Sequence, residues 1–185
     1  MPHPTAVINV VGLSSSLIGE HCPTLHQRAA AGRLTRLEPI LPAVTTSAQS
    51  TMLTGLMPAD HGIVGNGWYH RDLAEIRFWH RSNHLVHGDK VWETARRQDP
   101  TITCANLFWW YNTYSSCDLM AQVRPIYKAD GRKIPDCYTD PPELRHVLQK
   151  KFGQFPLFRF WGPLADRTSS DWIVSTTLEV HQRFE

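Results

Sequence analysis

L-P-A-V-T-T-S-A-Q-S-T-M-L-T-G-L-M-P-A-D-H-G-I-V-G-N, residues 41–66, is the stretch of the chain that decides the fold. Pro42 prevents the preceding chain from continuing as a helix, and the hydroxyls of Thr45 and Thr46 are of the kind that caps a helix N-terminus. A glycine, Gly55, follows after one helix length. We therefore predict a helix that begins near Thr45 and ends at Gly55.

The start of this predicted helix has the properties of an anion site. Its first turn would leave backbone N–H groups without partners and place the positive end of the helix dipole beside the Thr45 hydroxyl. Such an arrangement attracts phosphate, and a threonine hydroxyl there can serve as a nucleophile. The alternative is that Thr45 or Thr46 only caps the helix.

The stretch also resembles the type I phosphodiesterase/nucleotide pyrophosphatase family of the alkaline phosphatase superfamily. That family carries P-T-x-T-F-P-N-H, then a helix ending in T-G-L-x-P, then x-H-G-I-x-x-N. Residues 42–45, 54–58 and 61–66 match these three parts without a gap. The resemblance makes Thr45 the nucleophile and Asn66 the donor to a phosphoryl oxygen. It is good over roughly the first 70 residues and only general beyond them.

The resemblance implies a fold and a reaction. The fold would be α/β, an alkaline-phosphatase-like three-layer sandwich with a mostly parallel sheet. The reaction would be hydrolysis of a phosphate monoester or diester through a covalent threonyl intermediate. Two divalent metal ions, usually zinc in the family, would bind the Thr45 oxygen and the leaving oxygen. Nucleotides, phosphodiesters, phosphonates and sulfate esters all remain open as substrates.

One position departs from the family at a point that matters for chemistry. The family's first strand ends in Asp-Gly, and that aspartate is a metal ligand, whereas here the aligned pair is Val11-Gly12. Valine cannot bind a cation, and its presence removes a hard oxygen ligand and a negative charge. The F-P-N-H part is also changed, at residues 46–49. The sequence therefore also allows a second function, that of a catalytically inactive, metal-free phosphate-binding or scaffold relative.

The extent of the resemblance suggests that only part of the family's domain is present. The family's catalytic domain is longer than this chain, and its remaining metal ligands lie in the part that follows. We expect residues 1–185 to form a partial domain, the N-terminal portion of a truncated fold. Half of such a fold would expose apolar surface and favour self-association. The residues expected at this surface are Trp109, Trp110, Trp161 and Trp172.

Composition excludes several classes of protein. The chain is 42% hydrophobic and 19% charged, with a formal net charge of +2 and no dense basic run, so we expect no nucleic-acid surface. No apolar stretch approaches the roughly 20 residues that span a bilayer, and no secretory signal is recognised. We therefore expect a cytoplasmic protein without membrane contact. Its four cysteines form no C-x-x-C pair and are expected to be free thiols, namely Cys22, Cys104, Cys117 and Cys137.

Periodicity and turn residues predict alternating strands and helices, a pattern that favours a parallel sheet covered by helices. Ligands of such sheets bind beyond the carboxyl ends of the strands. The strands are predicted at residues 6–11, 34–40, 76–79 and 101–108. Besides the helix at Thr45, helices are predicted at residues 24–31, 91–97, 143–151 and 171–181.

Two further clusters suggest function. His80 and His84 are four residues apart, a spacing that would hold a metal on a helix, although Ser82-Asn83 favours an exposed polar loop. The aromatic run at residues 108–114 could stack a base or line a pocket, pack against the sheet, or lie exposed if part of the fold is missing.

Overall fold

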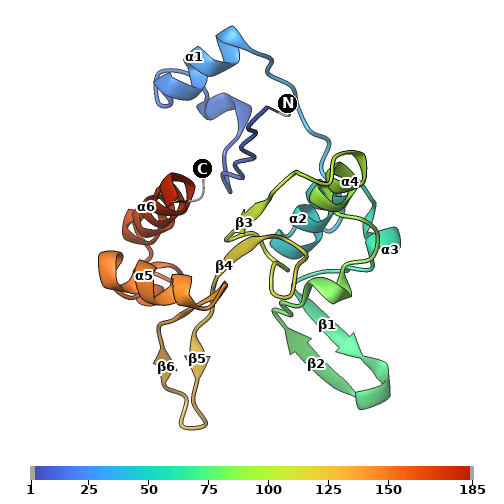
Figure 1. The fold of residues 1–185 in the computed structure, drawn as a ribbon. Coiled ribbons are helices and arrows are strands. Elements are labelled where there is room, and N and C mark those ends of the chain that lie inside the picture. Colours follow the sequence, from blue (N-terminus) through green and yellow to red (C-terminus); the bar gives the residue numbers. More distant parts are fainter. Residues whose placement is uncertain (1–2, 184–185) are drawn as a thin grey trace. The chain divides into compact units, whose positions relative to one another are not determined.

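The computed structural model describes residues 3–183. The chain divides into two units, Met1–Pro39 and Ile40–Glu185. The order of elements along the chain is shown in Figure 1. The helices are α1 (Pro23–Ala31), α2 (Thr45–Thr54), α3 (Pro58–His61), α4 (Val91–Gln98), α5 (Glu143–Phe152) and α6 (Arg167–Arg183), with short 3-10 turns η1 (Ser15–Leu17), η2 (Arg71–Leu73), η3 (Asn83–Leu85) and η4 (Leu157–Arg159). The strands are β1 (Gly67–His70), β2 (Glu75–Phe78), β3 (Ala105–Leu107), β4 (Leu119–Val123), β5 (Ile126–Tyr127), β6 (Lys133–Ile134) and β7 (Cys137–Asp140).

The first unit contains one regular helix, and its start and end follow from local sequence. Pro23 occupies the first turn of α1, where its missing N–H group costs nothing, and Gly32 follows the last residue. The helix predicted at residues 24–31 is therefore confirmed. The strands predicted at residues 6–11 and 34–40 are wrong, because both segments are irregular in the structure.

The physical reason for this error is the lack of a strand partner. A strand needs a hydrogen-bonded neighbour as well as an apolar pattern, and residues 3–39 contain no strand with which either segment could pair. The apolar side chains of the first segment accordingly remain exposed, with Ile8 at 80% and Val11 at 79%.

The second unit is built around a small mixed sheet in the order β3-β4-β7. The central strand β4 runs parallel to β3 and antiparallel to β7, with Ala121 opposite Leu107 on one side and opposite Thr139 on the other. All five residues of β4 are buried. Burial of every residue is typical of a strand covered on both faces. The one polar residue, Gln122, donates from Nε2 to the Trp109 carbonyl at 3.0 Å.

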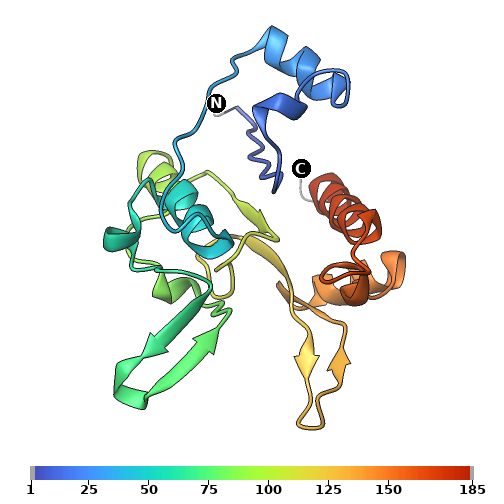
Figure 2. The same ribbon diagram turned by 180° about the vertical axis from the view of Figure 1, so that it is seen from behind.

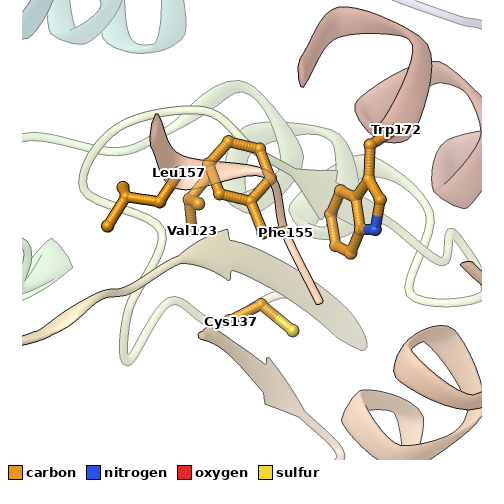
Figure 3. Packing of buried hydrophobic residues seen from close by; sticks show 5 residues of the cluster. All are labelled: Val123, Cys137, Phe155, Leu157 and Trp172. Atoms are coloured by element: carbon orange, nitrogen blue, oxygen red, sulfur yellow. The ribbon is translucent and has the colours of Figure 1, made fainter. Parts of the chain in front are cut away.

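One cluster of the core lies where the sheet meets α6 and the chain after α5 (Figure 3). Its buried residues are Val123 of β4, Cys137 of β7, Phe155, Leu157 and Trp172 of α6. The Trp172 ring packs edge-on against Phe155 at a centroid distance of 5.3 Å. Its Nε1–H donates to the Gly153 carbonyl, at 3.2 Å. The indole thus satisfies its polar group while its ring is buried.

A second cluster joins β4 to the two C-terminal helices. Leu119 packs with Leu144 and Leu148 of α5 and Val180 of α6. The two helices lie side by side in the view from behind as well (Figure 2). The helix predicted at residues 143–151 is confirmed, as are those at 91–97 and 171–181, the last being longer in the structure.

Two antiparallel hairpins extend from the second unit (Figure 1). In the first, β1 pairs with β2, so the hairpin strand predicted at residues 76–79 is confirmed up to Phe78. The second is the short pair β5–β6. The strand predicted at residues 101–108 forms only over the three residues of β3, of which Asn106 is buried.

The fold class is therefore a mixed α/β arrangement of helices and small sheets, as predicted in outline. The exposure predicted for the tryptophans is wrong at two positions, since Trp110 and Trp172 are 8% and 6% exposed. Both close apolar clusters inside the second unit. Trp161 is exposed as predicted, at 45%, and Trp109 is half-buried. Between residues 3 and 183, no helix has both the length and the apolar character needed to cross a membrane.

Candidate active site

The site begins where an irregular segment turns into α2. Val44 is the N-cap residue and makes no capping bond with its side chain, so Thr45 is the first helical residue. The Ser47 hydroxyl donates back to the Pro42 carbonyl at 2.6 Å. This bond fixes the direction in which the chain enters the helix. The predicted helix from Thr45 to Gly55 is confirmed.

The cap of α2 comes from a distant residue. The Thr46 N–H group donates to Oδ1 of Asn66, which lies 20 positions later, at 3.2 Å. Neither the Thr45 nor the Thr46 hydroxyl caps the helix, so the alternative in which they serve only as caps is wrong. The structure thus brings Asn66 to the first turn of α2, beside Thr45.

This bond also sets the orientation of the Asn66 amide. A backbone nitrogen can only donate, so the amide atom facing it must be the oxygen, and the NH₂ group must face away from the Thr46 nitrogen. Asn66 is half-buried. At the positive end of a helix, the amide therefore presents hydrogen-bond donors rather than acceptors to a ligand, which suits an oxyanion.

The two adjacent threonines differ in accessibility. Thr45 is partly exposed, whereas Thr46 is 0% exposed. The Thr46 Oγ1 atom is buried and has no hydrogen-bond partner among the described residues. Only the Thr45 hydroxyl is therefore within reach of a molecule in solution.

The segment between α2 and Asn66 holds the amide in place. Gly55 ends α2 with a left-handed φ of 70°, Pro58 begins α3, and Gly62 ends it with φ 81°. His61 between them is fully buried. Ile63, the residue after Gly62, is fully buried as well. These two buried side chains hold the segment that leads to Asn66.

His61 connects this segment to α2 through both ring nitrogens. Its Nδ1 accepts the Ile63 N–H at 3.1 Å, so Nε2 carries the proton and donates to Thr51 Oγ1 at 3.0 Å. Burial lowers the pKa of His61, which keeps the ring neutral. The histidine is a structural bridge that ties the middle of α2 to the loop leading to Asn66.

The aromatic run borders α2 on another side. The Trp110 N–H group donates to Oε1 of Gln49 in α2, at 2.6 Å. Trp110 and Tyr111 pack in a buried cluster with Ile63, as the core-packing interpretation predicts. Tyr114 is exposed. The role of Gln49 could not be predicted from the sequence, because its partner, the Trp110 N–H group, lies 61 positions later and no local pattern connects the two.

The backbone of this run is strained. Phe108, Tyr111 and Tyr114 have φ values of 63°, 58° and 62°, in the left-handed region that bulky residues rarely adopt. Asn83 Nδ2 donates to the Tyr111 carbonyl at 2.8 Å, and Asn112 Nδ2 to that of Ala121 at 2.8 Å. Buried amide bonds of this kind hold the strained conformation.

The two histidines spaced four apart do not share a helix face. His80 is half-buried, and its Nε2 lies 3.0 Å from Nε2 of His70, while His84 is exposed in η3. Burial, then the nearby charges of His70 and Arg77, lower the pKa of His80. Residues 3–183 hold no group of three or more His, Cys, Asp or Glu side chains that could bind a metal ion.

The donors at the start of α2 do not fit a cation. The Asn66 oxygen is already used by the Thr46 N–H group, and the helix end carries partial positive charge. Val11, in the first unit, offers no oxygen. The described residues thus suit an anion and do not by themselves suit the metals that the family generally uses.

Comparison with known proteins adds the family. Residues 5–183 match the family model described as type I phosphodiesterase / nucleotide pyrophosphatase. Curated proteins and solved structures give no match. The match extends well beyond the first 70 residues and covers nearly all of the 185-residue chain. The chain belongs to the type I phosphodiesterase / nucleotide pyrophosphatase family.

Proposed function

We propose that this protein is a phosphoric ester hydrolase in which Thr45 is the nucleophile and Asn66 binds a non-bridging phosphoryl oxygen. The observation that carries the proposal is the bond from the Thr46 N–H group to Asn66 Oδ1. It orients the Asn66 NH₂ group as a donor at the same helix end where the Thr45 hydroxyl is accessible. Family membership supports hydrolysis of small phosphate esters or nucleotides.

The physical logic concerns charge. A phosphoryl group carries negative charge on its non-bridging oxygens, and this charge grows as a nucleophile approaches phosphorus. The Asn66 NH₂ group and the first-turn N–H groups of α2 are fixed donors that stabilise it without reorganising. Thr45, one residue from the capped nitrogen, would be held for in-line attack. Thr46, although adjacent, is excluded as nucleophile by its burial.

The Thr45 hydroxyl must lose its proton to attack phosphorus, and no described residue is proposed as the base that takes it. A threonine hydroxyl is a weak nucleophile at neutral pH because almost all of it is protonated. In the family, metal ions supply this activation, but the donor set at the start of α2 does not fit a cation.

A second candidate function is phosphate binding without turnover. Val11 at the position of the family's aspartate favours it, as does the lack of a metal-binding group within residues 3–183. The anion-binding features at α2 serve this function equally well. For the fold and assembly, we propose the family's three-layer sandwich with a mostly parallel sheet, and self-association through exposed apolar residues.

Variants of the two threonines and of Asn66 test these functions. The measurements are hydrolysis of bis(p-nitrophenyl) phosphate in buffer containing zinc, and binding of orthovanadate by calorimetry. Thr45→Ala should abolish hydrolysis and trapping of phosphothreonine while changing vanadate affinity only a few-fold. Thr46→Val is the matched control, because it keeps the N–H donor and removes a hydroxyl that has no partner.

Asn66 variants separate binding from folding. Asn66→Ala should weaken vanadate binding by about tenfold, the value of one hydrogen bond to a charged group. Asn66→Asp keeps an acceptor for the Thr46 N–H group but adds negative charge, so it should fold as well as the wild type and bind vanadate more weakly still. Vanadate binding without hydrolysis in the wild type would favour the second function. Vanadate binding unaffected by either Asn66 variant would contradict both.

A further inference from the structure

Two of the four cysteines lie side by side at the beginning of the mixed sheet. Cys104 precedes β3 and Cys117 lies two residues before β4, and these strands are parallel neighbours (Figure 1). Their Sγ atoms are 3.8 Å apart. The surrounding backbone is well fixed, since the Asp118 N–H group donates to the Cys104 carbonyl at 3.0 Å and the Cys104 N–H group to Asp118 Oδ2 at 2.7 Å.

The two thiols are chemically unequal. The Cys117 thiol donates to the Cys104 sulfur, which lowers the pKa of Cys104, and the positive charge of Arg96 lowers it further. Arg96 is held nearby by bonds to the Ser116 carbonyl and the Asp118 carboxylate. The pKa of Cys117 is raised, because its proton is held in the bond to Cys104. Cys104 is therefore the better nucleophile and Cys117 the resolving partner.

Both cysteines are accessible, and the segment between them is special. Each is partly exposed, unlike Cys137, which is buried in the core and whose pKa burial raises to about 11. The 13 positions that separate the pair include Phe108, Tyr111 and the Trp110 N–H group that binds Gln49 of α2. A bond between the two sulfurs would close this strained aromatic loop.

We propose that Cys104 and Cys117 form a reversible disulfide that fixes the aromatic loop against α2. A hydroperoxide is the oxidant. The Cys104 thiolate attacks the peroxide oxygen, giving a sulfenic acid and, from hydrogen peroxide, one water. The Cys117 thiolate then attacks the Cys104 sulfur, forming the S–S bond and releasing the sulfenic oxygen as a second water. Two thiols and one peroxide thus yield one disulfide and two waters.

The geometry requires only a small change to reach this state. The sulfur atoms must approach from 3.8 Å to about 2.05 Å, which side-chain rotation can supply while the paired backbone stays in place. A reductant such as a dithiol reverses the bond by exchange. Neither residue belongs to the α2 site, so formation of the disulfide can be tested apart from hydrolysis.

Peptide mapping gives a direct test. Trypsin cuts after Arg97 and after Lys128, since Arg124 between them is followed by Pro125, so both cysteines stay on one peptide. After treatment of the whole chain with hydrogen peroxide, this peptide should lose two hydrogen atoms in mass, and free thiols should fall from four to two. Cleavage at the intervening aromatic residues should then leave two fragments joined until dithiothreitol is added.

Single variants define the pair. Cys104→Ser and Cys117→Ser should each prevent the mass change, whereas Cys22→Ser, the matched control, should leave it intact. The oxidised wild type should unfold about 5–10 °C above the reduced form, as expected for a closed loop of this length. Four thiols after oxidation, or a cross-link to Cys22 or Cys137, would overturn the proposal. A Cys104–Cys117 bond without a thermal shift would overturn its restraint of the loop.

Discussion

The two units of the chain use similar apolar residues with opposite results. Within residues 3–39, Val7 and Ile8 are 68% and 80% exposed, and α1 buries none of its side chains. In the second unit, Ile63 and Phe155 are 0% and 1% exposed. The difference lies in partners, since the second unit supplies neighbouring strands and helices whereas the described part of the first supplies one helix. An apolar run becomes a strand or a core element only when other elements cover it.

Helices α1 and α2 extend the comparison to polar residues. Helix α1 depends on local signals at Pro23 and Gly32. Helix α2 instead is held by residues from elsewhere, through Asn66 at its first turn and His61 at its middle. The bounds of α1 therefore follow from its own sequence. The contacts that hold α2 come from distant residues, and they bring Asn66 to the candidate site.

Among the variants that test this contrast, Trp172→Ala should cause the largest loss of stability. It removes a buried ring that packs on Phe155 and Phe108, and it should lower the free energy of unfolding by about 3–5 kcal/mol. Ile8→Ala, the matched change in the first unit, should alter it by less than about 0.5 kcal/mol, because Ile8 is mostly exposed. Urea titrations of both variants provide the measurement. Equal losses would show that residue 8 is covered and that the contrast is false.

A smaller effect is expected for His61→Asn. The asparagine oxygen can still accept the Ile63 N–H group, but the bond to Thr51 is lost, so we expect a loss of about 1–3 kcal/mol at pH 8. His84→Asn, at an exposed position, should cost little. Thermal unfolding at fixed pH distinguishes the two.

The pH dependence sharpens this second test. Burial lowers the pKa of His61 in the folded state, so the unfolded chain takes up the proton more readily. The stabilisation is complete above the unfolded value of about 6.5 and is lost as the pH falls through the folded pKa. His61→Asn should reduce this acid loss without abolishing it, since the pKa of His80 is lowered too. An unchanged profile would mean that His61 is not buried as a neutral ring.

The smallest effect on stability is expected for Val11→Asp. Val11 is 79% exposed, so the charge should change the free energy of unfolding by less than about 0.5 kcal/mol. Urea titrations of the variant and the wild type provide the measurement. A large loss of stability would argue against the exposure of the first segment.

Local signals account for the parts of the fold that could be predicted. Proline at the start and glycine at the end delimit α1, and Gly55 ends α2 as predicted, although the cap of α2 comes from Asn66 and not from the hydroxyl residues that led to the prediction. Non-local pairing accounts for what was missed. Strand β7 was not predicted, because its four residues lie between Pro135 and Pro141, and prolines disfavour strands, yet β4 pairs with all four.

The site divides in the same way. The resemblance pointed to Thr45 and Asn66, and the structure places Asn66 at the start of α2. Neither the choice of the Thr46 nitrogen as its partner nor the role of Gln49 could be derived, because the contacts join residues 20 and 61 positions apart. Chain separation of this size leaves no periodic signal in the sequence.

The side chains that α2 buries determine which sequences this helix tolerates. They are Thr46, Ser47, Gln49 and Ser50, all polar. The Ser50 hydroxyl donates to the Thr46 carbonyl, and the Ser47 hydroxyl to that of Pro42, so these groups satisfy themselves within the segment. Leucine at position 47 or 50 would be larger than the native serine and would remove these bonds. Alanine, serine and threonine should therefore dominate functional variants in a saturation library, reversing the usual preference for apolar residues inside.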